Sequence, residues 1–361
     1  MEQLRYWLAL TLIKGLGPVT AKQVVTAFGD AREVFRQKTE QIVSVAGINQ
    51  SRAQLIAYFN DWNLIDKAIE RVERFGATII TFHDPLYPEG LKQIYDPPPV
   101  LFVKGVLQPN DRFAVAIVGS RICTNYGKDV TQKMTASLCA KGFTIISGMA
   151  RGIDTIAHTS TIKAGGRTIA VLGSGIDVPY PAENVQLFRK ISESGAIISE
   201  FPPGTRPIKE NFPKRNRLIS AMSLGVLVVE ASERSGALIT ARHAVEQGKE
   251  VFAIPGNINW LTSKGTNDLI KKGARLVDDT DDIVEELAPL LKGYLREAKR
   301  ELPPLNEEEH AILRICDREP THIDDIIRQT NMAPSRVMSV LLDLELKGVV
   351  KQWEGKKFSS T

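Results

Sequence analysis

Unbroken apolar runs alternate with amphipathic intervals through the middle of this 361-residue chain. The two clearest runs, 113–118 and 143–146, end abruptly in small polar residues, with GSR at 119–121 and SG at 147–148. Short apolar runs bounded in this way are typical of buried parallel strands. A helix-length interval separates them, so the pattern predicts a βαβ unit. Its loops open at the carboxyl edge of a sheet, where such sheets bind ligands.

The same pattern continues along the chain. Further strands are expected at 168–172, 196–199, 225–229 and 250–254, with a short one at 275–277. Helical intervals lie between nearly all of these runs, as in sheets built from repeated βα units. The sequence therefore predicts an α/β fold over residues 111–290, a Rossmann-like doubly wound parallel sheet.

Residues 1–75 have a helical pattern with two similar phrases, at 13–22 and 45–53, in which a glycine turn joins two helices. These phrases resemble helix-hairpin-helix or SAM-like modules, whose helix N-termini can face a phosphate. A helical packing module without nucleic-acid contact is an equally open interpretation. Residues 76–110 are rich in proline, which cannot donate to a central ladder, so we expect a connection and an edge of the sheet there.

After the expected sheet, residues 291–304 are predicted to be a linker because they are charged and contain two adjacent prolines. Residues 305–361 show three helical patterns and a terminal ribbon, which is the outline of a winged helix. This segment carries eight Lys and Arg against ten Asp and Glu. A protein-contact module is therefore at least as consistent with it as a DNA-reading face.

The overall composition limits the functional classes to which the protein can belong. The net charge is only +4, so a nucleic-acid surface has to be a local patch. Three scattered cysteines give neither disulfide nor metal spacing and favour a reducing compartment. No apolar run approaches the ~20 residues of a membrane span, and the first residues lack a signal-peptide profile. We expect a cytoplasmic protein with no membrane contact and no metal site.

The expected carboxyl edge lacks the known nucleotide motifs but has the chemistry of a phosphate site. GSR differs from the G-x-G-x-x-G fingerprint, and no P-loop motif occurs, so NAD, FAD and P-loop ATP chemistry are disfavoured and no cofactor is expected. Small residues and cations recur there at four loops: Gly119, Ser120 and Arg121; Gly148 and Arg151; Gly173, Ser174 and Gly175; Ser235 and Gly236. Tight turning alone could explain any one loop, whereas the recurrence favours phosphate binding at helix N-termini.

Residues 202–218, PPGTRPIKENFPKRNRL, are expected to form a basic loop beside this edge. Its five cations, against one acid, are Arg206, Lys209, Lys214, Arg215 and Arg217, and among them stand Asn211, Phe212 and Asn216. Cations that follow a backbone and a ring that stacks on bases are what hold single-stranded nucleic acid. The alternative is a solvated loop with Phe212 in the core.

Support for catalysis is weaker. Asp154 and His158 are four residues apart on an expected helix, where such a pair usually forms a local salt bridge. No nucleophile with an adjacent base and no cluster of metal ligands accompanies the glutamates near the strand ends. No catalytic residue is therefore assigned.

Long motifs carry a family resemblance. VAIVGSR (115–121), SGMARGIDTIAH (147–158), NFPKRNRLIS (211–220), EASERSGALITARHA (230–244) and FAIPGN (252–257) resemble the DprA family, DNA-processing protein A, also called Smf. The resemblance implies a protein that binds single-stranded DNA during natural transformation and helps to load the RecA recombinase onto it, without enzymatic turnover. The family's DNA contacts fall on Arg121, Lys209, Phe212, Lys214, Arg215 and Arg217.

The full set of candidate DNA-binding residues joins these contacts to those reached from the residues alone: Gly119, Ser120, Arg121, Gly148, Arg151, Lys209, Asn211, Phe212, Lys214, Arg215, Asn216, Arg217, Ser235 and Gly236. The chain departs from the family at Ala182-Glu183, where relatives can carry a lysine. This part of the rim of the binding site is therefore expected to contribute less to DNA binding than in those relatives. The resemblance also implies a homodimer, with Ile270 and Leu276 as apolar contacts.

The alternative function is a nucleotide phosphoribohydrolase on the related scaffold of the lysine-decarboxylase-like (LOG) proteins. Their PGGxGTxxE loop has a carboxylate on the following helix. The comparable stretch of this chain, residues 233–240, has no carboxylate after its glycine.

Overall fold

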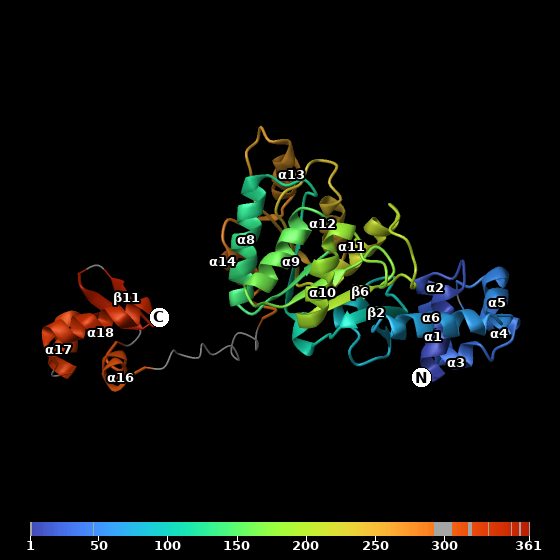
Figure 1. The fold of residues 1–361 in the computed structure, drawn as a ribbon, viewed down its shortest axis with the longest axis horizontal. Coiled ribbons are helices and arrows are strands. Elements are labelled where there is room, and N and C mark those ends of the chain that lie inside the picture. Colours follow the sequence, from blue (N-terminus) through green and yellow to red (C-terminus); the bar gives the residue numbers. More distant parts are fainter. Residues whose placement is uncertain are drawn as a thin grey trace. The chain divides into compact units, whose positions relative to one another are not determined.

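The computed structural model describes residues 2–45, 47–291, 305–316, 320–330, 332–347, 349–353 and 355–360. The chain divides into two compact units, residues 1–292 and 293–361. The first unit begins with helices α1 (Glu2–Leu12), α2 (Pro18–Phe28), α3 (Ala31–Val34), α4 (Thr39–Val43), α5 (Gln50–Ala57) and α6 (Trp62–Arg74). We call these helices the N-terminal helical module (Figure 1).

A mixed sheet follows, in the order β1-β2-β6-β5-β4-β3-β7-β8-β9. Its strands are β1 (Thr78–Thr81), β2 (Val100–Gly105), β3 (Ala114–Val118), β4 (Thr144–Ser147), β5 (Thr168–Val171), β6 (Ala196–Ser199), β7 (Gly225–Val228), β8 (Glu250–Ala253) and β9 (Arg275–Leu276). Strands from β6 to β9 pair in parallel, which confirms the doubly wound α/β prediction. Strands β1 and β2 add an antiparallel edge.

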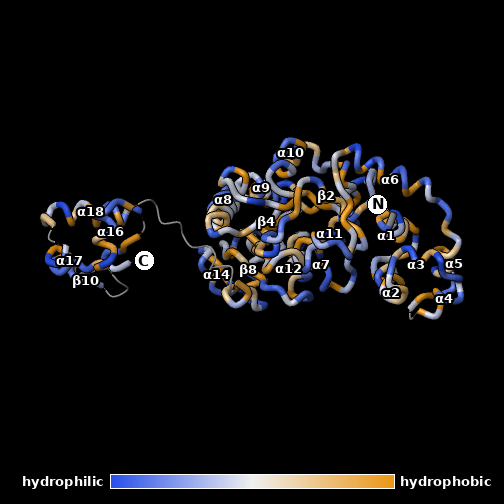
Figure 2. Tube along the Cα trace, turned by 90° about the horizontal axis from the view of Figure 1, so that it is seen from below, coloured by the Kyte–Doolittle hydropathy of each residue, from blue (hydrophilic) through white to orange (hydrophobic). Residues whose placement is uncertain are grey.

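Helices cover both faces of the sheet. They are α7 (Glu89–Lys92), α8 (Asn125–Ala140), α9 (Ile153–Lys163), α10 (Val185–Ser194), α11 (Asn211–Ala221), α12 (Ala237–Glu246), α13 (Lys264–Lys271) and α14 (Thr280–Leu287), with short 3₁₀ turns at Pro109–Arg112, Ala182–Asn184 and Leu261–Ser263. Adjacent strand residues face opposite sides, so Phe102 packs in one core and Leu101 in the other. Figure 2 shows the strands between a layer with α8, α9 and α10 and a layer with α11 and α12.

The N-terminal helical module shares one of these cores. Trp7 and Leu8 of α1 belong to the same buried cluster as Phe102 and Phe188 of the sheet region. The guanidinium of Arg71 on α6 contacts the Asp177 carboxylate at 2.5 Å. The second oxygen of Asp177 accepts the Gly204 N–H at 2.7 Å, so one carboxylate joins α6 to residues 202–205. The module is thereby fixed to the loop that leads into α11.

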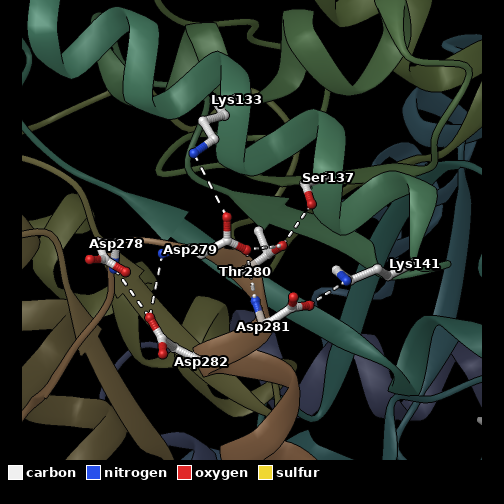
Figure 3. Close-up of polar contacts among 8 residues, drawn as sticks. All are labelled: Lys133, Ser137, Lys141, Asp278, Asp279, Thr280, Asp281 and Asp282. Atoms are coloured by element: carbon white, nitrogen blue, oxygen red, sulfur yellow. Dashed lines mark hydrogen bonds and ion pairs between the residues drawn. The ribbon is translucent and has the colours of Figure 1, made fainter. Parts of the chain in front are cut away.

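Helix α14, the last helix among the described residues of the first unit, is bonded to α8 (Figure 3). Asp279, Thr280 and Asp281 meet Lys133, Ser137 and Lys141, which are spaced one helical turn apart. The hydroxyls of Ser137 and Thr280 lie 2.6 Å apart, and the Lys141 ammonium lies 2.6 Å from Asp281. Asp282 accepts backbone N–H groups of Asp278 and Asp279, which caps α14.

The second unit has the predicted winged-helix outline. It contains α16 (Glu307–Leu313), β10 (Thr321–His322), α17 (Ile323–Thr330), α18 (Pro334–Leu346), β11 (Val350–Trp353) and β12 (Lys357–Ser360). Its strands pair in the order β10-β12-β11 around a separate core. The predicted linker at 291–304 lies outside the described residues except for Leu291. No helix in the described ranges is long and apolar enough to cross a membrane.

Candidate nucleic-acid interface

The sheet has a switch point between β3 and β7. The chain passes outward from β3 through β4, β5 and β6, then returns to form β7 on the other side of β3. The loops after β3 and β7 therefore diverge, which is where open α/β sheets bind ligands. A groove of about 700 Å³ lies at this point. Its lining, which defines the switch-point groove, includes Gly119, Ser120, Arg121, Ile122, Asp154, Tyr180, Lys209, Phe212, Arg215, Asn216, Arg234, Ser235 and Gly236.

The loop after β3 is held by close backbone contacts. The Ile153 N–H donates to the Ser120 carbonyl at 3.1 Å. Gly152 has φ +74°, and a Cβ there would lie 2.2 Å from the same carbonyl oxygen, so only glycine fits. The Ser120 hydroxyl donates a hydrogen bond to the Ile122 carbonyl at 2.6 Å. These contacts leave the Arg121 side chain exposed at the groove.

Phe212, in the first turn of α11, is half-buried beside Arg121. The Arg121 guanidinium carbon lies 5.3 Å from the ring centroid of Phe212. The Tyr180 ring lies 5.6 Å from the Phe212 ring at 43°. A Cβ on Gly173 would lie 2.8 Å from the Phe212 ring, so the absence of a side chain there lets the ring sit close to the strand end. The site thus places the long, exposed side chain of Arg121 over the Phe212 ring.

Arg215 is buried beneath the groove, with 3% of its surface exposed. Its guanidinium donates to the Gly148 carbonyl at 2.7 Å and also to the Val171 carbonyl. Burial lowers its pKa to about 10. Arg215 therefore supports the loops after β4 and β5 more than it offers charge at the surface.

Asp154 lies beside Arg215 at the groove. Its Oδ2 accepts the N–H groups of Gly148 and Ala150 at 3.2 and 3.3 Å. Burial raises the pKa of Asp154 to about 6, although Arg215 and these N–H groups oppose the shift. The expected salt bridge to His158 is wrong: the His158 ring bonds the Thr168 hydroxyl at 2.7 Å, and burial lowers its pKa to about 3.

The structure places Arg217 away from the groove. Its guanidinium contacts Glu200 at 2.5 Å and Asp96 at 3.0 Å. It lines a different cavity, of about 320 Å³, on the side of Lys249. Residues two positions apart on a helix are separated by about 200° around its axis, so Arg215 and Arg217 face opposite sides of α11. Burial raises the pKa of Glu200.

The interpretation of 202–218 as one loop was wrong in its second half, since α11 begins at Asn211. Pro213 fits there because a first-turn N–H has no intrahelical acceptor. Asn211 and Asn216 are buried, and Asn216 bonds the Gly236 carbonyl at 3.2 Å. Lys214 is exposed but lies outside the groove lining.

Arg151 also lies outside the groove lining. It borders a small adjoining pocket that contains Gly148, Tyr180 and Phe212. The Glu183 carboxylate contacts the Arg151 guanidinium, and this contact lowers the pKa of Glu183. Glu183, which stands where relatives can carry a lysine, thus neutralises Arg151 beside the groove.

Four of the lining residues named above, Ile122, Asp154, Tyr180 and Arg234, were not among the predicted DNA-binding residues. Tyr180 was passed over, although an aromatic residue beside a glycine-rich strand end was a usable signal. Arg234 stands between Glu233 and Ser235 in a segment whose charges nearly balance, so no such signal marked it. The described ranges contain no cluster of three or more His, Cys, Asp or Glu side chains placed to hold a metal.

Comparisons with known proteins agree with this architecture. The family model described as DNA recombination-mediator protein A matches residues 78–288, and the DprA winged helix domain matches 296–356. Protein Smf of Synechocystis is 35% identical over 98% of both chains. DNA processing protein DprA of Bacillus subtilis is 47% identical over 59% of this chain and 72% of its own.

Solved structures of related proteins are also similar to this chain. DprA from Streptococcus pneumoniae matches with a TM-score of 0.69 and 35% identity, over 78% of this chain and 97% of its own. DNA processing protein A from Helicobacter pylori, described as having a unique single-stranded DNA binding mode, has a TM-score of 0.54 and 31% identity. The latter match covers 59% of this chain and 96% of the other.

Proposed function

Because the chain belongs to the DNA recombination-mediator protein A family, we propose that it binds single-stranded DNA in the switch-point groove without sequence preference. The observation that carries this is the half-buried Phe212 ring between loops that present Arg121 and Lys209. Neither cation has an ion-pair partner among the described residues, so both are available to phosphates. The Helicobacter pylori relative is described as binding single-stranded DNA.

Binding requires Arg121 to move. Its guanidinium covers the Phe212 ring, and a base stacks on the ring only after the guanidinium turns toward a phosphate. Stacking contributes about 1–3 kcal/mol per base and tolerates every base, while cations make binding salt-dependent. Arg215 holds the groove from below, and Arg217 has a structural role on the other side of α11.

The test is fluorescence anisotropy with labelled oligothymidylate and a duplex of equal length over a salt series. The variant is Arg121→Glu with Lys209→Glu. The charge-matched control is Arg189→Glu with Lys190→Glu, two exposed cations on α10 without an ion-pair partner in the described ranges. We expect single-strand preference that weakens with salt and is lost only in the groove variant. Unchanged binding by that variant would refute the site.

In the cell, the proposed role is to protect incoming single strands during natural transformation and to help load RecA recombinase onto them, in the cytoplasm. The support is the family's description as a recombination mediator. Purified protein should speed RecA assembly on covered single strands, and the groove variant should not. The proposal assigns binding without turnover, so release of free base from a nucleoside monophosphate would favour the phosphoribohydrolase alternative.

A homodimer through the β9 edge is part of the proposal. Strand β9 ends the sheet, Leu276 on it is 45% exposed, and Ile270 of α13 is half-buried. An open edge strand offers unpaired backbone groups to a second copy. Sedimentation should show a dimer that Leu276→Asp converts to monomer. Leu86→Asp, at another exposed leucine, is the control; a monomeric wild type at micromolar concentration would refute the dimer.

A further inference from the structure

The segment that follows Arg121 runs across the carboxyl ends of three neighbouring strands. Arg121 follows β3, and the backbone N–H and hydroxyl of Thr124 donate to Glu230, just after β7, at 2.9 and 2.5 Å. The Tyr126 hydroxyl donates to the Pro255 carbonyl, just after β8, at 2.9 Å. Since β3, β7 and β8 are adjacent, this segment leads from the switch-point groove along the edge of the sheet.

An exposed aromatic pair lies at the end of this path. Tyr126 and Trp260 are 6.2 Å apart at 66°, and they are 37% and 44% exposed. Ile258 and Leu261 beside Trp260 in sequence are 80% and 70% exposed. Ile122, 86% exposed, belongs to the groove lining and begins the path. Contiguous exposed apolar side chains of this size mark binding surfaces.

The loop that carries Trp260 is held in place before any ligand arrives. Gly256 and Asn267 exchange two hydrogen bonds, at 3.1 and 2.9 Å. The Ala231 N–H donates to the Thr262 carbonyl at 2.8 Å, which joins this loop to the chain that enters the groove wall. A loop whose backbone is already held in place loses little conformational freedom on binding.

We propose that a single strand held in the switch-point groove continues over the ends of β7 and β8 and stacks a base on Trp260. Exposed cations on both sides suit a phosphate chain: Arg234 lines the groove, and Lys264 follows the loop. Neither has an ion-pair partner within the ranges that the structure describes. Strands lie ~4.8 Å apart, so β8 is ~10 Å from β3, about three nucleotides at the ~3.4 Å rise of a stacked strand.

This inference rests on the proposed function, and oligonucleotide length separates the two. Anisotropy is measured for the intact protein with oligothymidylates of about 3 and about 20 nucleotides. The short one cannot span the roughly three steps from the groove to Trp260, and the long one exceeds the ~4–16 nucleotides of known single-strand sites. Trp260→Ala should weaken binding of the long oligonucleotide by about tenfold and leave the short one nearly unchanged. Trp260→Phe should restore most of the loss. Trp353→Ala, at a 46% exposed tryptophan in the second unit, is the control.

Equal loss for both lengths, or no loss for the long one, would overturn the second stacking position. A shift of Trp260→Ala from dimer to monomer in sedimentation, with DNA binding unchanged, would assign the surface to a second copy and also overturn it. Failure of the wild-type protein to bind either oligonucleotide would instead refute the proposed function.

Discussion

Replacing Arg217 with alanine should destabilise the protein and leave DNA binding intact. The guanidinium has 11% side-chain exposure, equal to that of Glu200, whereas Asp96 is 36% exposed. Removing one partner of a buried ion pair costs about 3–5 kcal/mol because the remaining charge stays buried. Water can reach Asp96, so the lower end, about 3 kcal/mol, is expected. With a urea m-value of ~3 kcal/mol/M, the midpoint falls by about 1 M.

Urea titration followed by circular dichroism measures this midpoint, and anisotropy in buffer measures oligothymidylate binding by the folded variant. Arg121→Glu is the reciprocal control, with a normal midpoint and weak binding. Adding Glu200→Gln to Arg217→Ala should recover part of the loss, since no buried charge then remains unpaired at that position. A folded Arg217→Ala protein that binds more than about tenfold more weakly, with an unchanged midpoint, would contradict the assignment.

Three further outcomes follow from the groove. Burial raises the pKa of Asp154 from 3.8 to about 6, so its stability contribution is present at low pH and is lost as pH rises through about 6. Single-strand affinity should fall over the same range as the carboxylate ionises, and Asp154→Asn should flatten both pH profiles. Lys209→Ala should reduce the slope of log K against log salt by about 0.7. Gly152→Ala should lower the urea midpoint and DNA affinity, because its Cβ would meet the Ser120 carbonyl at 2.2 Å; Gly165→Ala, also at positive φ but with open space, should lower the midpoint less and spare affinity.

The parallel sheet was predictable because each buried strand is marked in the local sequence by a short apolar run. The apolar run at 113–118 and the loop 119–121 that ends it place β3 and Arg121 without any tertiary information. The antiparallel pairing of β1 with β2 was not predictable in this way. Short strands among prolines have a weak pattern, and their partners are set by the completed sheet.

The candidate site was predictable at the level of the segment but not of each side chain. The basic composition of 202–218 located Phe212 and Lys209 at the groove. Treating 211–218 as a loop hid the helical rotation that sends Arg215 and Arg217 to opposite faces. Arg217, not Arg215, forms the ion pair with Glu200, and this pairing depends on the tertiary fold that brings Glu200 to α11.

The contacts between α14 and α8 determine how mechanical load would enter the first unit. A pull on the chain beyond this unit would act first on the buried Leu291 and Leu287, and then on Asp279, Thr280 and Asp281 at the start of α14. These residues hold α8 at Lys133, Ser137 and Lys141, along the same side of one helix (Figure 3). The other end of α8 begins beside Thr124, at the rim of the groove. Once the buried leucines give way, such a load would pass along α8 toward the rim of the groove where the nucleic acid is proposed to lie.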